Sequence, residues 1–454
     1  MREGLQKVAS SDDTIVAIST PVGRSGIGVV RLSGSNAEAI GNQFLKRPLS
    51  HQRAVMGRWQ GPDGEVVDEV VVVLFRSPQS YTGEDLLEIS AHGNPLILNR
   101  IVSMVQSAGA RIANPGEFTL RAVAHGKMDL IQAEAVRDVI DAQTEMQART
   151  AFRQVSGAAS KKIAPIKQEL VDLVAHLEAG IDFAEDDVDV PDAGAIADRV
   201  GRVRASLEAL QETYSYGKLM STGIRIVIAG KPNVGKSSLF NRLVEADRAI
   251  VTDVPGTTRD VVSESGIVEG IPMKFLDTAG VRDTLDQIEQ IGVSRTMEAL
   301  TEADLALVVL DGTSAITEED GRVRETVRGL PHVVVANKCD LGRSADLDYL
   351  QPVWVSAKTG EGLDALRCSI WGALSDKQSN GLAEFVLTSA RQNEAVLRAI
   401  AGLMSGESAL RSGIPQEMVL LDLYAALSAL NELTGETTTE DILGRIFSTF
   451  CIGK

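Results

Sequence analysis

Cysteine, aromatic side chains and positive charge are all scarce in this chain. Its 454 residues include three cysteines, and aromatic residues make up 4% of them. A sparse, odd cysteine count argues against a disulfide scaffold or a structural zinc site and favours a reducing compartment. Few aromatic rings disfavour stacking platforms for single-stranded nucleic acid. The formal net charge of -17 disfavours nucleic-acid binding by bulk charge, although it does not exclude a local basic patch.

Long apolar runs are missing as well. No segment reaches the roughly 18 uninterrupted apolar residues that a membrane span needs, and the first residues do not form the apolar stretch of a signal peptide. We therefore expect a soluble cytoplasmic protein. Apolar residues make up 44% and charged residues 24%, which is typical of folded domains. At roughly 100–200 residues per domain, the length favours two to four domains.

Apolar periodicity divides the chain into four segments. Residues 1–126 combine strand-like runs with glycine-rich turns, which predicts an α+β domain. Residues 127–221 and 379–454 repeat apolar residues three and four apart, the spacing of helices in a bundle. Residues 222–378 alternate strand and helix patterns, which indicates an α/β domain. Because the helical segments flank it, we predict that the α/β domain is inserted into a helical bundle domain.

Particular runs give the expected elements of these domains. Strands are expected over residues 14–19, 28–33, 66–75 and 86–90, and a helix over 96–105. The apolar seams of two bundle helices are expected to contain Ile163, Ile166, Leu170, Leu173 and Leu177 in one helix, and Leu420, Leu423, Leu427 and Leu430 in the other. Pro165 is expected in a first turn or at a kink. The acidic run 182–189 is expected in a solvated loop.

One motif decides the chemistry of the α/β segment. Residues 230–237, the phosphate loop, read Gly-Lys-Pro-Asn-Val-Gly-Lys-Ser and lie between an apolar strand and a helical pattern. The glycines allow backbone N–H groups to face a β-phosphate. Lys236 can bridge the β- and γ-oxygens, and Ser237 can bind Mg²⁺. The expected phosphate-binding residues are Asn233, Val234, Gly235, Lys236, Ser237 and Ser238.

Three further motifs follow in an order that indicates a Ras-like GTPase domain. In the first, Asp277 can lie near Mg²⁺ through water and the Gly280 N–H can sense the γ-phosphate. In the second, the Asp340 carboxylate can accept two N–H groups from guanine, which adenine cannot offer in that arrangement. In the third, residues 356–358 suit a backbone contact to guanine O6. The expected nucleotide-binding residues are Asp277, Thr278, Ala279, Gly280, Asn337, Lys338, Asp340, Ser356, Ala357 and Lys358.

The loop between the first two motifs, residues 252–260, has the position of a switch element. Thr258, with Thr257 beside it, is expected to reach Mg²⁺ only while the γ-phosphate is present. Val281 stands where many GTPases carry a glutamine that orients the attacking water. Another group must do so here; the charged candidates nearby in sequence are Arg282, Glu289 and Glu302. No arginine finger is obvious, so a cation or a partner is expected to offset the transition-state charge.

The end of the chain resembles a known family. Residues 441–454 read Asp-Ile-Leu-Gly-Arg-Ile-Phe-Ser-Thr-Phe-Cys-Ile-Gly-Lys and, together with residues 256–260 and 115–118, resemble the bacterial and organellar tRNA modification GTPases, often called MnmE or TrmE. The resemblance implies an N-terminal domain that binds a 5-formyl- or 5,10-methylene-tetrahydrofolate and forms a homodimer. The matching positions are Arg31, Glu88, Lys127 and Lys454. Arginine and lysine suit the carboxylates of folate, and a glutamate suits the N–H groups of its pterin ring.

The resemblance also implies GTP hydrolysis stimulated by potassium. Its matching K⁺ ligands are Asn233, Thr252, Val254 and Thr257, and its Mg²⁺ ligands are Ser237 and Thr258. The covering loop that contacts the nucleotide and the ion comprises Thr252, Asp253, Val254, Pro255, Gly256, Thr257 and Thr258. The K⁺ ion would offset charge where an arginine finger otherwise acts. Glu289 matches the acid that orients the attacking water and is the implied catalytic residue.

The family acts with an FAD-containing partner of the MnmG type in a heterotetramer. Together they add an aminomethyl or carboxymethylaminomethyl group to carbon 5 of the wobble uridine of certain tRNAs, with the one-carbon unit from folate. Cys451 lies in the terminal motif, and a chemical role, a conformational role and a small buried thiol are all open for it. Cys339 and Cys368 are expected to be structural.

Two other functions compete with this interpretation. A ribosome-assembly switch GTPase would bind RNA without modifying it, and it would need a basic RNA-binding domain beyond the GTPase segment. The segment after Leu374 is instead neutral to acidic and helical. A folate-dependent transferase with a vestigial nucleotide site is disfavoured by the intact phosphate loop and by Asp340.

Overall fold

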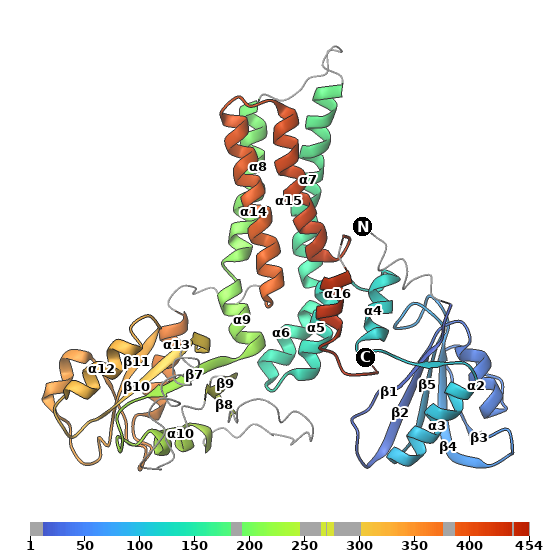
Figure 1. Cartoon of the computed structure of the whole chain (residues 1–454), viewed down its shortest axis with the longest axis horizontal. Helices are drawn as coiled ribbons and strands as arrows, with labels where there is room; N and C mark the ends of the chain where they lie inside the picture. The colour runs from blue at the N-terminus through green and yellow to red at the C-terminus, as the bar shows by residue number, and fades with distance from the viewer. Residues whose placement is uncertain are drawn as a thin grey trace. The chain divides into compact units, whose positions relative to one another are not determined.

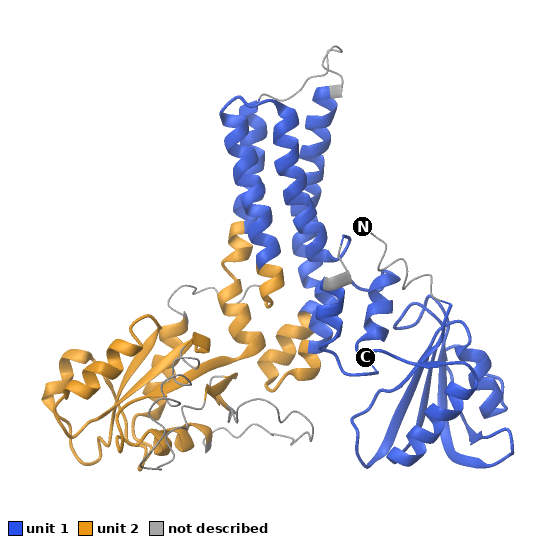
Figure 2. Cartoon of the chain, in the orientation of Figure 1, with its two compact units in different colours: residues 1–137, 154–207, 394–454 blue, residues 138–153, 208–393 orange. Residues whose placement is uncertain are grey.

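A computed structural model gives the fold of the chain. It describes residues 12–182, 193–245, 265–268, 270–276, 301–375, 386–437 and 440–453. The chain forms two compact units (Figure 2): unit 1 comprises residues 1–137, 154–207 and 394–454, and unit 2 comprises residues 138–153 and 208–393. The boundaries that the sequence suggests at residues 126, 221 and 378 stay predictions.

Unit 1 begins with a six-stranded sheet in the order β3-β4-β5-β2-β1-β6 (Figure 1). Its strands are β1 (Ile15–Ile18), β2 (Ser25–Ser33), β3 (Ala54–Gln60), β4 (Val66–Phe75), β5 (Leu86–Gly93) and β6 (Arg111–Ile112). All neighbours are antiparallel except β1 and β6. The predicted strand over residues 66–75 agrees with β4 at both ends, and the helix expected over residues 96–105 lies within α3 (Pro95–Ser107).

Different helices pack against the two faces of this sheet. Val16, between Ile15 and Ala17 on β1, joins a core formed with α2 (Ala37–Leu45) and α3. Ile15 and Ala17 point to the opposite face and pack with Phe118 of α4 (Glu117–Ala124). Side chains alternate along a strand, so Arg31, between the α2/α3-facing residues Val30 and Leu32, lies on the α4 face of β2.

Long helices form a bundle, most of which belongs to unit 1 (Figure 1). They are α7 (Ala158–Asp182), α8 (Ala193–Gln211), α14 (Ala390–Arg411) and α15 (Gln416–Thr434). Ion pairs join neighbours: Arg199 to Glu169 joins α8 to α7, Arg204 to Glu407 joins α8 to α14, and Arg398 to Glu432 joins α14 to α15. The shorter helices α5 (Leu130–Asp141) and α16 (Glu440–Phe447) complete the helical part.

Two expectations for the bundle need correction. Pro165 lies inside α7, so the first-turn alternative is wrong. The buried stripe of α15 includes Val419, Leu423, Ala426, Leu430 and Leu433, whereas Leu420 and Leu427 are half-buried. The leucine spacing predicted the right helix, but its buried stripe also contains a valine and alanines. The expected loop over residues 182–189 falls outside the described residues, apart from the helical backbone of residue 182.

Unit 2 contains a second six-stranded sheet, in the order β12-β11-β10-β7-β9-β8. Its strands are β7 (Ile224–Ala229), β8 (Ser265–Val268), β9 (Ile271–Leu276), β10 (Leu305–Asp311), β11 (His332–Asn337) and β12 (Val353–Trp354). All pairs are parallel except β8 with β9. The helices are α6 (Glu145–Val155), α9 (Tyr214–Thr222), α10 (Lys236–Glu245), α12 (Glu318–Thr326) and α13 (Leu363–Ser375), with a 3-10 helix η1 (Ala345–Leu350).

This parallel sheet is buried on both faces. On β10, Leu305, Leu307 and Val309 join one core, whereas Ala306 and Val308 join the other. Nearly continuous apolar strands are the sequence pattern of such a sheet. The predicted α/β fold is confirmed, and the carboxyl ends of β7, β10, β11 and β12 meet at one edge, where ligands of such sheets bind. No helix of the described ranges is long and apolar enough to cross a membrane.

Candidate functional site

The phosphate loop connects β7 to α10 and requires glycine at two points. A Cβ atom on Gly230 would lie 2.4 Å from the Val309 carbonyl oxygen. A Cβ atom on Gly235, which has a φ of +92°, would lie 2.3 Å from Asn337 Nδ2. Asn233 adopts a left-handed conformation with a φ of 63°. The loop therefore folds back tightly before α10 begins, and the free N–H groups at the start of a helix favour an anion.

The amine of Lys236 is held within this loop. Its Nζ donates hydrogen bonds to the carbonyl oxygens of Gly230 at 2.7 Å and Lys231 at 2.8 Å. Burial lowers the pKa of Lys236, and the charge of Glu319 opposes this effect only in part. Phosphate oxygens can replace the two neutral carbonyls and supply the negative charge that a half-buried ammonium group lacks. Ser237 and Ser238, in the first turn of α10, are exposed.

Asn337 connects the three described nucleotide motifs. It is the last residue of β11 and is only 2% exposed. Its Nδ2 donates to the carbonyl oxygen of Val234 at 2.8 Å, and its Oδ1 accepts from the backbone N–H of Ala357 at 3.0 Å. Both polar atoms of the Asn337 amide therefore form hydrogen bonds with backbone groups of neighbouring loops. This role of Asn337 in joining the loops was not evident from the sequence.

The predicted base-binding residues lie together beside these loops. Ser356 Oγ donates to Asp340 Oδ1 at 2.7 Å, which fixes the carboxylate through one oxygen. Lys338 has a φ of 68°, and its Nζ pairs with Asp311 Oδ2 at 2.7 Å. Although burial alone would raise the pKa of Asp311, hydrogen bonds from Lys338 and Thr313 hold it below its usual value. Lys358 is exposed next to this group.

Asp311 is a residue that sequence reasoning missed. It ends β10, an apolar parallel strand, at the same sheet edge as the phosphate loop. An acid at the carboxyl end of such a strand was the available signal. Its ion pair with Lys338 fixes the aliphatic stem that is expected to lie along the base.

Thirteen of the predicted site residues lie outside the described residues. They are Thr252, Asp253, Val254, Pro255, Gly256, Thr257, Thr258, Asp277, Thr278, Ala279, Gly280, Glu289 and Lys454. Val281 and Arg282 are also outside them, whereas Glu302 is described and exposed. The roles expected of the thirteen stay predictions.

In unit 1, Arg31 and Glu88 lie opposite each other on β2 and β5. Arg31 Nη2 and Glu88 Oε1 form an ion pair of 2.6 Å. The guanidinium carbon lies 5.6 Å from the ring centre of Tyr81 and 5.9 Å from that of Phe118. Lys127 Nζ donates to the carbonyl oxygen of Pro78 at 2.9 Å. Two of the four residues matched for folate are thus in direct contact, and a third is bound to the segment that carries Tyr81.

Comparison with known proteins identifies the family. The family model of the MnmE helical domain matches residues 130–451, and that of the GTP-binding protein TrmE N-terminus matches residues 14–127. A tRNA modification GTPase MnmE from Koribacter versatilis is 48% identical over 452 residues, which cover 98% of this chain and 99% of the relative. The chain belongs to the MnmE family of tRNA modification GTPases.

Other MnmE proteins match over similar lengths. The protein from Aquifex aeolicus is 43% identical over 449 residues, 97% of this chain and 100% of that protein. The protein from Thermotoga maritima is 39% identical over 453 residues, 97% of this chain and 100% of that protein. Membership of the MnmE family and the phosphate loop make the chain a GTP hydrolase.

The terminal motif that suggested MnmE lies against the N-terminal part of unit 1. Ser19 Oγ donates to the Gly453 carbonyl oxygen at 3.1 Å, and a Cβ atom on Gly453 would lie 2.4 Å from the Ile18 carbonyl oxygen. A Cβ atom on Gly116, at the start of α4, would lie 2.9 Å from the Phe447 carbonyl oxygen. The Cys451 side chain is exposed, so its interpretation as a small buried thiol is wrong. Cys339 is buried and Cys368 is exposed.

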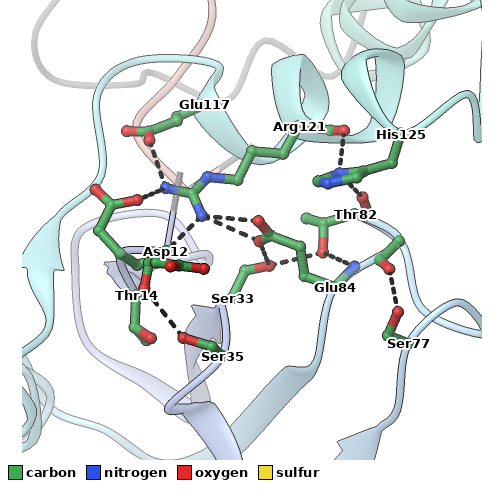
Figure 3. Close-up of polar contacts among 12 residues, drawn as sticks. Asp12, Thr14, Ser33, Ser35, Ser77, Thr82, Glu84, Glu117, Arg121 and His125 are labelled. Carbon is green, nitrogen blue, oxygen red and sulfur yellow. Dashed lines mark hydrogen bonds and ion pairs between the residues drawn. The ribbon is translucent and has the colours of Figure 1, made fainter. Parts of the chain in front are cut away.

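A buried charge cluster supports the same α4 in unit 1 (Figure 3). Arg121, whose side chain is 1% exposed, forms ion pairs with Asp13 at 2.7 Å, Glu84 at 3.0 Å and Glu117 at 3.0 Å. Glu84 also accepts from Ser33 Oγ at 2.7 Å. The Arg121 cluster, defined as these five residues, was not predicted from the sequence. It joins α4 to residues 77–85, and these two segments carry the Phe118 and Tyr81 rings beside Arg31.

Proposed function

We propose that this GTP hydrolase of the MnmE family uses K⁺ in hydrolysis and takes part in adding an aminomethyl or carboxymethylaminomethyl group to carbon 5 of the wobble uridine of certain tRNAs. The one-carbon unit would come from a tetrahydrofolate, and an FAD-containing partner of the MnmG type would complete the enzyme. The observation that carries this proposal is sequence identity of 48% and 43% to two tRNA modification GTPases over nearly the full length of the chain.

The potassium part of the proposal starts from Asn233. This residue is exposed and has a left-handed backbone in the phosphate loop, so its amide oxygen is accessible to a monovalent cation. Thr252, Val254 and Thr257 are the proposed further ligands, with Mg²⁺ held by Ser237 and Thr258. Glu289 is proposed to orient the attacking water. The K⁺ charge would offset the negative charge that develops between the β- and γ-phosphates.

Potassium use is tested by comparing GTP turnover in KCl and in NaCl at equal ionic strength. The proposal expects turnover to be faster in KCl by at least about tenfold, the scale of a single well-placed charge at a phosphoryl transition state. Asn233→Ala should remove most of this difference, so that the variant hydrolyses GTP at similar rates in the two salts. Equal rates of the unsubstituted protein in the two salts would exclude potassium from the mechanism.

The folate part of the proposal rests on Arg31 and Glu88. A guanidinium beside two aromatic rings suits a flat conjugated ligand that carries carboxylates. Because Arg31 and Glu88 bond to each other, folate would replace this ion pair with its own carboxylate and N–H groups. Lys127 and Lys454 would add positive charge. Calorimetry with 5-formyl-tetrahydrofolate tests this: Arg31→Met should abolish binding, whereas Arg58→Met, which removes an exposed ion pair on the same sheet, should not.

The assembly is proposed to be a homodimer that joins its FAD-containing partner as a heterotetramer in the cytoplasm. The sparse, free cysteines support a reducing compartment. The decisive experiment is mass analysis of wobble uridines in tRNA from cells that lack this protein. The proposal expects the modified uridine to disappear and to return with the unsubstituted gene but not with Lys236→Met. Unchanged uridines in the deletion strain would reject the proposed reaction.

A further inference from the structure

The second residue of the phosphate loop is tied to a helix outside the loop. Lys231 Nζ lies 3.0 Å from Asp320 Oδ2, and the two side chains are 18% and 3% exposed. Asp320 lies in the first turn of α12, the helix that follows β10. The two residues are far apart in sequence, and neither was singled out by a motif. An ion pair so well shielded from water is screened much less than a surface pair.

Asp320 already has a structural task at the start of α12. With Thr317 it forms a capping box: Asp320 Oδ2 accepts from Thr317 N at 2.9 Å and from Thr317 Oγ at 2.7 Å, and Asp320 N donates to Thr317 Oγ at 3.4 Å. Although burial alone would raise the pKa of Asp320, the hydrogen bonds of Thr317 and Lys231 lower it. The carboxylate therefore stays charged next to Lys231.

The two carboxylate oxygens of Asp320 differ strongly in their hydrogen bonding. Oδ2 accepts from Thr317 and from Lys231, whereas Oδ1 is buried and has no hydrogen-bond partner among the described residues. A buried carboxylate with one unpaired oxygen is unfavourable. Capping alone does not need a charge at this third helical position, because the neutral amide of glutamine fills the same place in other capping boxes. The start of α12 favours a negative charge here, and Lys231 adds a direct cationic partner for it.

The backbone of Lys231 contacts Lys236, the lysine at the end of the phosphate loop. Its carbonyl oxygen is one of the two that accept from Lys236 Nζ, and the other belongs to Gly230. Gly230 packs tightly against the Val309 backbone of β10. Both carbonyls that hold the amine are thus fixed by β10 and α12, Gly230 through close backbone packing and Lys231 through its ion pair with Asp320.

We propose that Lys231 and Asp320 form a positioning pair for the phosphate loop. The pair fixes the first turn of the loop, so that Lys236 and the loop N–H groups are in place before the nucleotide arrives. Without it, part of the binding free energy of the nucleotide is spent on ordering the loop. Binding of GTP and GDP weakens, whereas the bound nucleotide restores the loop and is hydrolysed at nearly the normal rate. The signature is a raised KM with little change in kcat.

The test uses the full chain with Lys231→Met, Asp320→Asn, the double variant and Lys231→Arg. Affinities for GDP and GTP are measured by calorimetry, together with kcat, KM and the melting temperature. Each single neutral variant should lose about 5- to 20-fold in affinity, which is part of the worth of one charge-assisted hydrogen bond, because the bound nucleotide restores the loop. The double variant should be no weaker than the singles. Lys231→Arg should recover most of the affinity, because it restores the cation.

Arg328→Met is the matched control, since it removes an exposed ion pair between the turn after α12 and Glu325 of that helix. It should leave nucleotide affinity unchanged. Lys231→Met keeps the capping box, so it tests the proposal even where Asp320→Asn fails to fold. Folded Lys231→Met protein with normal affinity would overturn the proposal. So would additive losses in the double variant, or a fall in kcat at unchanged KM.

Discussion

Arg121 in unit 1 and Lys236 in unit 2 are both cations withdrawn from water, but they have different partners. Arg121 is surrounded by the carboxylates of Asp13, Glu84 and Glu117. Lys236 donates to two backbone carbonyls, and no carboxylate of the described residues forms an ion pair with it. The pKa of Arg121 is raised despite its burial, whereas burial lowers that of Lys236.

This difference separates a structural charge from a functional one. A buried cation that is already paired gains little from a further anion. Its removal costs stability, because Glu84 loses its cationic partner, whereas Asp13 and Glu117 keep their ion pairs with Arg111. A half-buried cation with neutral partners is held in place while its charge remains available. Burial in the loop destabilises the charged form of the Lys236 amine. A bound phosphate stabilises that charge again, and this gain contributes to the affinity of the site for an anion.

Lys236→Met should give the largest functional effect and the smallest structural one. Loss of its charge at the phosphates should lower kcat/KM for GTP by at least about a hundredfold. The melting temperature should stay the same or rise, because a poorly compensated charge has been removed. GTP turnover and thermal unfolding of the same preparation check both. A marked fall in melting temperature would show that Lys236 is structural and would remove the contrast with Arg121.

Arg121→Met should show the opposite pattern. Breaking a buried ion network by removing one partner costs about 3–5 kcal/mol of unfolding free energy, so we expect a strongly destabilised unit 1. Arg58→Met removes an exposed ion pair with Glu69 and should cost less than about 1 kcal/mol. Urea unfolding of both variants provides the measurement. Similar losses for the two would mean that burial of the Arg121 cluster contributes little.

The sequence predicted the nucleotide site far better than it predicted the Arg121 cluster. The phosphate loop, β7 and the start of α10 follow from a local pattern in which each residue has a fixed task. The Arg121 cluster joins residues 13, 33, 84, 117 and 121, which only the folded sheet brings together. No spacing rule connects such positions, and an arginine on an amphipathic helix is usually exposed.

The same reason explains the smaller misses. Asp311 and Asp320 act on lysines of other motifs, and the Asn337 amide binds backbone of two other loops. The predicted apolar seam of α15 was partly wrong, because leucine spacing alone does not tell which helix face is fully buried. Strand β4, by contrast, was predicted at both ends from a largely apolar run, and its buried residues Val70, Val72 and Leu74 alternate along the second half of the strand.

Asp340→Asn should change which base is bound and leave stability nearly unaffected. The Asp340 carboxylate is held by the neutral hydroxyl of Ser356, so, like Lys236, it keeps its charge available. An amide can still bond Ser356 but cannot accept both N–H groups of guanine, and GTP affinity should fall about 10- to 100-fold. Xanthine carries a carbonyl where guanine carries its amino group, so affinity for XTP should rise. Unchanged GTP binding would reject the assigned base pocket.

Acid unfolding should give the smallest effect, because Glu117 is one of several groups that titrate. Although burial alone would raise the pKa of Glu117, hydrogen bonds from Arg111, the Asn114 N–H and Arg121 hold it below its ordinary value of 4.5. A carboxylate whose pKa is lower in the folded state stabilises the fold above the unfolded pKa, and this contribution is lost as pH falls through the folded pKa. Stability should therefore fall below about pH 4.5. Glu117→Gln should be less stable at neutral pH but should lose less on acidification, as urea unfolding at two pH values would show. An equal acid loss in both proteins would mean that these hydrogen bonds do not lower the pKa of Glu117, and that its charge contributes little to the stability of unit 1.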